Sequence, residues 1–177
     1  MTERMNELGF KEVNVRNLEL NPFKAIGEHW MLVTAGNEKE SNTMTASWGG
    51  MGVIWNKNVA VTVIRPQRYT KKFVDAGELF TLSFYPDEMK KVLQYCGTVS
   101  GAGLGKNEKA KNAGLTELYL DSTVAYEQAE LILVCKKLYE APIKPEAFLD
   151  KSLIDSCYPQ SDFHQAYVGE IIAGYRK

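Results

Sequence analysis

Several protein classes are excluded by what the sequence has little of. It contains three cysteines, Cys96, Cys135 and Cys157, and no CxxC pair, so neither a disulfide framework nor a zinc site is indicated. No apolar run is long enough to span a bilayer, and the polar start of the chain lacks a secretory signal. We therefore expect reduced thiols, no bound metal, no membrane partner and a cytoplasmic location.

The sequence also lacks an excess of either charge and a nucleotide-binding glycine motif. Its 21 Lys and Arg and 22 Asp and Glu give no electrostatic support for a nucleic-acid partner. The glycines of residues 101–105 do not have the GxGxxG spacing of a Rossmann site. The chain offers no convincing set of a nucleophile with its base, or of paired carboxylates. We therefore do not expect chemistry that depends on such groups.

The 177 residues, of which 45% are hydrophobic, fit one domain over residues 1–177 with a sizeable core. Runs of β-branched and aromatic residues, bounded by Gly, Pro and Asn, predict strands. These strands are expected over residues 30–35, from 43 onward, and over 59–64, 79–84, 123–126, 130–139 and 164–175, with a hairpin turn at 56–58. Helices are expected over residues 21–27, 67–76, 87–95 and 106–112, with an irregular segment over 141–159 that has a helical turn at 145–149. This pattern indicates a mainly β barrel with a few short helices, and barrel mouths favour ligand binding.

Residues 42–48 read Asn-Thr-Met-Thr-Ala-Ser-Trp and place an amide, hydroxyls and small residues beside a large aromatic side chain. This composition suits a flat ring, whose edge needs polar partners and whose faces need close-packed walls. Because side chains alternate along a strand, backbone groups are expected to supply much of the ring recognition. Trp48 either covers a ring face or lies in the core or an interface. The glycines in residues 49–52 mark either a bulge or a close approach by a ligand or another backbone.

Residues 65–70 read Arg-Pro-Gln-Arg-Tyr-Thr and form a cationic corner where a helix is expected to start. Arg68 can meet two phosphate oxygens at once, Thr70 adds a neutral donor, and free backbone N–H groups at a helix start favour an anion. Arg65 offers either its charge or its backbone carbonyl. The alternative is that both arginines are solvated charges at the exit of a strand. Taken together, the two segments suit a ligand with a flat ring at one end and a phosphate at the other.

Both segments resemble the flavin reductase-like, FMN-binding split-barrel family, whose best-known members are flavin reductases and flavoredoxin. The resemblance extends over about residues 21–172, is strongest in 42–70 and is good in 162–172. It implies a split β-barrel of Greek-key topology and bound FMN. It also implies a homodimer with the flavin near the subunit interface.

The resemblance further implies which residues contact FMN. These are Asn42, Met44, Thr45, Ala46, Ser47 and Trp48 at the ring, and Arg65, Arg68 and Thr70 at the phosphate. Lys109 follows Glu108 where family members carry an Asp-Lys pair, so it is a further phosphate candidate, with Lys106 as its competitor. Ala102 stands where the family's Ser-Gly-Arg segment has its arginine, so a cation is missing from a loop that could border the nicotinamide position.

One of the two histidines belongs to a segment that resembles the family. Residues 162–170 are similar to the family's His-to-Gly-Glu segment, whose histidine lies near the flavin or the nicotinamide site. A histidine can donate to the negative charge that develops on reduced flavin. His164 is therefore the candidate catalytic residue, and the alternative is a structural role at a strand start. His29 is expected to be a surface or capping residue.

The resemblance implies an FMN-binding oxidoreductase of the flavin reductase type. It would take electrons from NAD(P)H as a transient reductant and pass them to free flavin or to a redox partner protein. Because hydride transfer is chemistry of the cofactor, such a protein needs few catalytic groups. Two alternatives stay open: a flavoredoxin-like FMN electron carrier with little direct NAD(P)H activity, and a non-catalytic flavin-binding module.

Overall fold

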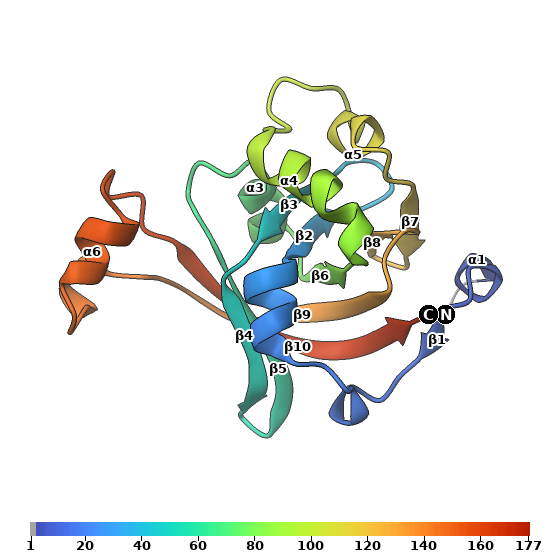
Figure 1. Ribbon diagram of the computed structural model, residues 1–177, viewed down its shortest axis with the longest axis horizontal. Helices are drawn as coiled ribbons and strands as arrows, with labels where there is room; N and C mark the ends of the chain where they lie inside the picture. Colours follow the sequence, from blue (N-terminus) through green and yellow to red (C-terminus); the bar gives the residue numbers. More distant parts are fainter. Residues whose placement is uncertain (1–2) are drawn as a thin grey trace.

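The computed structural model describes residues 3–177, which form a mainly β structure with short helices (Figure 1). The strands are β1 (Lys11–Glu12), β2 (Met31–Gly36), β3 (Ser41–Ala46), β4 (Gly49–Ile54), β5 (Lys57–Ile64), β6 (Leu79–Phe84), β7 (Glu117–Leu120), β8 (Thr123–Tyr126), β9 (Leu131–Pro142) and β10 (Gln165–Arg176). The α-helices are α1 (Glu3–Glu7), α2 (Pro22–Lys24), α3 (Thr70–Ala76), α4 (Lys90–Thr98), α5 (Glu108–Asn112) and α6 (Ser152–Cys157). Single 3-10 or π turns are η1 (Val15–Asn17), η2 (Ala25–His29), η3 (Asp87–Met89) and η4 (Pro145–Ala147). The prediction of a mainly β chain is confirmed.

The main sheet has eight strands in the order β3-β2-β6-β9-β10-β5-β4, with β1 added on β10, and every pairing in it is antiparallel. Strands β3 and β4 follow each other in the chain but lie at opposite ends of this path. Because β3 also contacts β5, the two ends of the sheet approach each other. Helices α3 and α4 pack on β3 (Figure 1), and β7 pairs with β8 alone.

Strand β2 is buried on both of its faces and contributes to two groups of core side chains. Met31 and Val33 belong to the first group, which also contains the fully buried Tyr167. Leu32 points the other way, into a second group around Tyr126. The alternation follows from the two-residue period of a strand. It explains why this strand reads in the sequence as an unbroken apolar run.

The strand expected from residue 43 onward is in fact two strands. Strand β3 pairs with β2, strand β4 pairs with β5, and residues 47–48 join them. Gly49 has φ 150°, and a Cβ there would lie 2.3 Å from the carbonyl oxygen of Val61. The close approach at Gly49 is therefore that of the β5 backbone. The hairpin turn lies at Trp55 and Asn56, both with positive φ (53° and 58°), one residue earlier than expected, as the two-residue turn of a twisted hairpin requires.

Several elements were not expected from the sequence: α1, β1 and η1 before residue 21, and also β7 and α6. Strand β7 is only four residues long and pairs with β8 alone, so its pattern is too short to stand out. Helix α6 lies within the segment expected to be irregular; its first turn is held by the Asp150 carboxylate, which accepts from the Ser152 N–H at 3.0 Å. The helical turn expected at 145–149 is present as η4. Helix α4 follows η3 and continues to Thr98, three residues beyond the predicted end.

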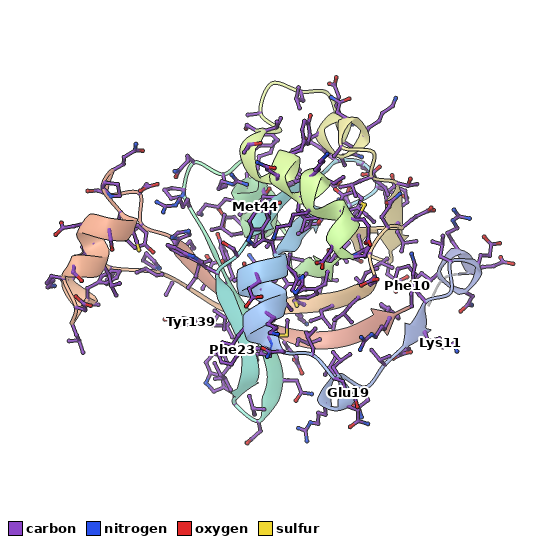
Figure 2. The ribbon with its side chains drawn as sticks, viewed as in Figure 1. Phe10, Lys11, Glu19, Phe23, Met44 and Tyr139 are labelled. Carbon is purple, nitrogen blue, oxygen red and sulfur yellow. The ribbon has the colours of Figure 1, made fainter. Side chains whose placement is uncertain are left out.

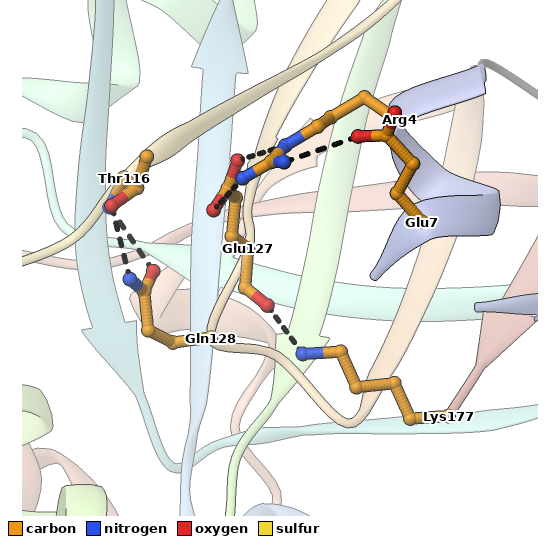
Figure 3. Close-up of polar contacts among 6 residues, drawn as sticks. All are labelled: Arg4, Glu7, Thr116, Glu127, Gln128 and Lys177. Carbon is orange, nitrogen blue, oxygen red and sulfur yellow. Dashed lines mark hydrogen bonds and ion pairs between the residues drawn. The ribbon is translucent and has the colours of Figure 1, made fainter. Parts of the chain in front are cut away.

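Both ends of the described chain are held on the turn between β8 and β9 (Figure 3). The guanidinium of Arg4, on α1, donates to both carboxylate oxygens of Glu127, at 2.7 and 2.9 Å. The Lys177 ammonium donates to the backbone carbonyl of Glu127 at 2.5 Å. Gln128 closes the same turn by bonding the backbone N–H and the hydroxyl of Thr116. These contacts lie on the side of the molecule opposite α6 (Figure 1).

Within residues 3–177, every helix is too short or too polar to cross a bilayer. In the same part of the chain, His, Cys, Asp and Glu side chains form no cluster suited to a metal ion.

Candidate functional site

Two adjoining cavities contain all eleven residues that the sequence analysis proposes for the site. The first, of about 270 Å³, is lined among others by Thr45, Ala46, Ser47, Trp48, Arg65 and His164. The second, of about 190 Å³, is lined among others by Asn42, Thr70 and Lys109. Met44 and Arg68 line both cavities and form the boundary between them. The structure therefore brings together residues that are up to 122 positions apart in the chain, from Asn42 to His164.

The position of β3 at one end of the sheet explains why consecutive residues can line one cavity. Figure 2 shows Met44 inside the molecule, in the region where α3 and α4 pack on β3. One edge of β3 pairs with β2, and no other strand of residues 3–177 pairs with its second edge. The Thr43 carbonyl points away from β2, since it accepts from Lys109. By the two-residue period of a strand, the backbone groups of Thr45 point the same way and are available to a ligand.

The second cavity contains a half-buried cation, Arg68, and a buried one, Lys109, neither of which has a carboxylate partner in the described part of the chain. The Arg68 guanidinium donates to the Gly97 carbonyl at 2.6 Å and reaches the Cys96 carbonyl at 3.4 Å. The Lys109 ammonium donates to the carbonyls of Cys96 and Thr43, both at 2.8 Å. These carbonyls solvate the two charges but do not neutralise them. An anion entering this cavity would supply the missing counter-charge.

The electrostatics of the two cations agree with this arrangement. Burial, with a smaller contribution from the neighbouring Arg68 charge, lowers the pKa of Lys109 from 10.5 to about 8, while Cys96 opposes the shift. Burial also lowers the pKa of Arg68. Burial raises the pKa of the Cys96 thiol to about 11, so this cysteine is protonated at neutral pH and supplies no negative charge. Lys106, the competing candidate, is exposed and does not line either cavity.

Asn42, Thr70 and Gly101 also line the second cavity. The Asn42 amide donates to the Thr70 hydroxyl at 2.8 Å, and both side chains are buried. Because that hydroxyl accepts from Asn42, its own hydrogen is free to donate to a ligand. Gly101 packs directly against this pair, since a Cβ there would lie 2.2 Å from the Asn42 side-chain oxygen. The next residue, Ala102, is exposed and lines neither cavity.

Arg65 lies in the first cavity, but its charge is already partnered. Its guanidinium is 2.5 Å from the Asp162 carboxylate and donates to the Cys157 carbonyl at 2.8 Å. It also lies over the ring of Tyr158, at 5.2 Å. The backbone carbonyl of Arg65 accepts from the Arg68 N–H. Arg65 therefore joins residues 143–164, which we call the arm, to the cavity, and Arg68 carries the less compensated charge.

His164 and Trp48 form the other end of the first cavity. Their ring centroids are 5.1 Å apart, and Trp48 is 43% exposed, so it is neither a core residue nor fully covered. His164 is buried, and its Nδ1 is 2.9 Å from the Tyr158 hydroxyl. Burial, followed by the Arg65 charge, lowers the pKa of His164 from 6.5 to about 4, while Asp162 opposes the shift. The imidazole is therefore neutral at pH 7.

Sequence reasoning missed the partners that hold these residues. Tyr158 and Asp162 come from the arm, and the carbonyls that solvate Arg68 and Lys109 come from the end of α4 and, in the case of Thr43, from β3. Gly101 meets Asn42, and the glycine in this loop is the one signal that could have indicated such a close approach. The carbonyl partners could not have been found from the sequence, because every residue has a backbone carbonyl.

No family model matches the sequence, and no curated protein matches it. Among solved structures, the FMN-binding domain of a flavin reductase-like enzyme from Shewanella baltica aligns with a TM-score of 0.67 at 15% identity, over 94% of this chain and 76% of that one. Flavoredoxin from Methanosarcina acetivorans aligns with a TM-score of 0.63 at 21% identity, over 94% and 75%. An FMN-binding protein from Thermus thermophilus aligns with a TM-score of 0.61 at 18% identity, over 89% and 77%.

The chain therefore has the split-barrel fold shared by FMN-binding flavin reductase-like proteins and flavoredoxins, as the sequence resemblance implied.

Proposed function

We propose that this chain binds FMN across the two adjoining cavities and works as a flavin reductase-like oxidoreductase. The observation that carries the proposal is the pair of cations, half-buried Arg68 and buried Lys109, with no carboxylate partner in residues 3–177. Burying unpaired charges is costly unless a counter-ion compensates them. A phosphate monoester, with nearly two negative charges and several acceptor oxygens, fits this need.

The residues of the two cavities divide between the two ends of FMN. Arg68, Lys109 and the Thr70 hydroxyl hold the phosphate, and Asn42 orients that hydroxyl. The backbone of residues 44–47 meets the polar edge of the ring. Trp48 borders one ring face, and His164 supplies a polar contact at the same end. Arg65 acts through the arm, because its charge is paired with Asp162.

When bound, FMN would supply the hydride and electron chemistry, with NAD(P)H as a transient reductant and free flavin or a redox partner protein as acceptor. The protein's own part is to exclude water from the phosphate, to orient the ring and to donate a hydrogen bond beside it. These tasks need neither a nucleophile nor paired carboxylates.

A flavoredoxin-like electron carrier is the second candidate, and one observation favours it. Ala102, which replaces the arginine of the resembling family, is exposed and places no cation at either cavity. A docking NAD(P)H would then lack one partner for its own phosphates. A non-catalytic flavin-binding module would bind FMN in the same cavities without turnover.

Anaerobic visible spectroscopy separates these functions. Purified protein saturated with FMN is mixed with NADH, then with NADPH, and finally with dithionite. We expect the bound flavin to bleach with a nicotinamide, and Lys106→Ala to behave like wild type. Bleaching by dithionite alone would favour the electron carrier. Failure of FMN to bind at all would refute the proposal.

Two further features of the proposal concern assembly and location. The chain works as a homodimer in the cytoplasm, with residues 1–177 acting as one FMN-binding domain. Exposed apolar side chains on the β4–β5 hairpin support an interface: Val53 is 65% exposed, and the exposed ring of Trp55 lies 6.2 Å from that of Tyr139. Light scattering of wild type and Trp55→Ser tests the dimer, and we expect the substitution to weaken it.

A further inference from the structure

The arm reaches the first cavity through a hydrogen bond between Tyr158 and His164. The Tyr158 hydroxyl lies 2.9 Å from Nδ1 of His164, and the two residues are 5% and 7% exposed. Since Nδ1 is already bonded, any hydrogen bond from this imidazole to a ligand must come from Nε2. The chemical character of Nε2 therefore decides what His164 can recognise.

The surroundings determine that character. His164 is neutral at pH 7, since its pKa lies at about 4, so one ring nitrogen donates and the other accepts. The Tyr158 hydroxyl has no second partner among residues 3–177, so it satisfies its hydrogen by donating it to Nδ1. In that arrangement Nδ1 accepts and the proton of the imidazole is on Nε2.

Tyr158 is itself firmly held. Its ring stacks on Phe163 with centroids 4.7 Å apart and meets the edge of Phe148 at 5.9 Å. The Arg65 guanidinium lies over the ring at 5.2 Å and is paired with Asp162. Rotation of the tyrosine away from His164 would disturb all of these contacts, so the hydroxyl is presented in one place.

We propose that Tyr158 is a positioning residue that fixes His164 with its proton on Nε2, so that the first cavity selects a ligand group with a lone pair or a negative charge beside His164. A carbonyl oxygen or an anionic ring edge meets this requirement, and a donor such as an N–H group does not. The ligand class rests on the proposed function, because FMN presents acceptor atoms along its ring. The assignment of the proton rests on the contacts of the protein alone.

Nitrogen NMR of the isotope-labelled protein tests the proposal directly. The chain has two histidines, and His29→Gln leaves only the signals of His164. We expect Nδ1 without a proton and Nε2 with one, unchanged from pH 6 to pH 8. Tyr158→Phe keeps the aromatic ring and removes the hydroxyl, and it should give a mixture of the two tautomers. A proton on Nδ1 in the parent protein, or the same tautomer after Tyr158→Phe, would overturn the proposal.

A kinetic comparison tests the consequence for the ligand. In His164→Gln the side-chain amide places an N–H donor close to the position of Nε2, whereas in His164→Asn it does not. We expect His164→Gln to retain flavin reduction better than His164→Asn. Tyr158→Phe should slow reduction by about tenfold, the weight of one oriented hydrogen bond, in the parent but not in the His164→Gln background. Equal slowing in both backgrounds would make Tyr158 structural. If FMN did not bind, the proposed function would fail while the NMR result would still stand.

Discussion

The titration of Lys109 gives the sharpest test of the proposal that the second cavity binds a phosphate. Its ammonium is buried, donates to two carbonyls and has a pKa of about 8. With that pKa, the charged fraction falls from about 76% at pH 7.5 to about 3% at pH 9.5, roughly 25-fold. A phosphate monoester has its second pKa near 6 and stays dianionic throughout this range. If the charged lysine holds the phosphate, FMN affinity should therefore fall up to about 25-fold over these two pH units.

The assay compares FMN with riboflavin, which has the same ring and no phosphate. Fluorescence titrations from pH 7.5 to pH 9.5 give both dissociation constants, and their ratio cancels any titration of the ring. Lys109→Met should weaken FMN binding at pH 7.5 and abolish the pH dependence of the ratio of the two dissociation constants. Lys106→Met is the matched control, since Lys106 is exposed and outside both cavities. A ratio that does not change with pH in the wild type would refute the assignment of Lys109.

The same lysine has a consequence for stability without ligand. Its folded pKa of about 8 lies below the ordinary lysine pKa of 10.5, so the unfolded chain binds more protons between these two pH values. The penalty for keeping Lys109 charged is complete below pH 8 and disappears as pH rises toward 10.5. It corresponds to about 3 kcal/mol. Between pH 8 and pH 10.5 the free energy of unfolding of the ligand-free wild type should therefore rise by up to about 3 kcal/mol relative to that of Lys109→Met, whereas Lys106→Met should keep this rise, and chemical denaturation measures the difference. Parallel pH profiles of wild type and Lys109→Met would contradict the lowered pKa of Lys109.

Three further predictions address other parts of the site. Arg68→Ala should lower the affinity for FMN by about 10- to 100-fold, the contribution of a charged hydrogen bond, and leave the affinity for riboflavin unchanged. An equal loss of affinity for both ligands would place Arg68 away from the phosphate. Gly101→Ala should weaken FMN binding, because the added Cβ would displace Asn42. Gly52→Ala is the control, since its Cβ would meet open space, and calorimetric titration of both variants with FMN measures the difference. The folded pKa of His164 is about 4, below its ordinary value of 6.5, so the free energy of unfolding should fall as pH falls from 6.5 to 4. His164→Gln should show a smaller fall, and parallel plots of unfolding free energy against pH for the two proteins would contradict this prediction.

The sequence predicted elements whose pattern is local and complete. Residues 79–84 and 123–126 form β6 and β8 as expected, because each run of apolar and β-branched residues is bounded by turn formers. The capped start at Asn21 is also confirmed, since its side chain accepts from the N–H groups of Phe23 and Lys24. The break between β3 and β4 was not predictable, because it follows from pairing with two different distant strands.

The candidate site was likewise predictable only in part. Residues 42–48 and 65–70 are short segments whose composition already indicates a ring and a phosphate, and the structure places them together. The choice between Lys106 and Lys109 depends on how the preceding loop is folded. Asn107 has φ 56°, and its side chain accepts from the Ser41 N–H at 2.8 Å, which orients α5 toward β3. Such a contact across 66 residues leaves no pattern in the sequence.

The arm can be regarded as an exchangeable insert in the split barrel. Strands β9 and β10 stay paired up to Pro142 and Gln165, and the Ile143 N–H bonds the His164 carbonyl just beyond that pair. The intervening residues project from the sheet (Figure 1), so their length and sequence can vary without changing any strand register. The second cavity is lined by β3, the start of α3, the end of α4 with the loop that follows it, and α5, and one of its lining residues, Gln67, donates to Asp162 of the arm at 2.7 Å. Evolution or design can therefore rebuild the surroundings of His164 in the first cavity while Arg68 and Lys109 of the second cavity keep their carbonyl partners from α4 and β3.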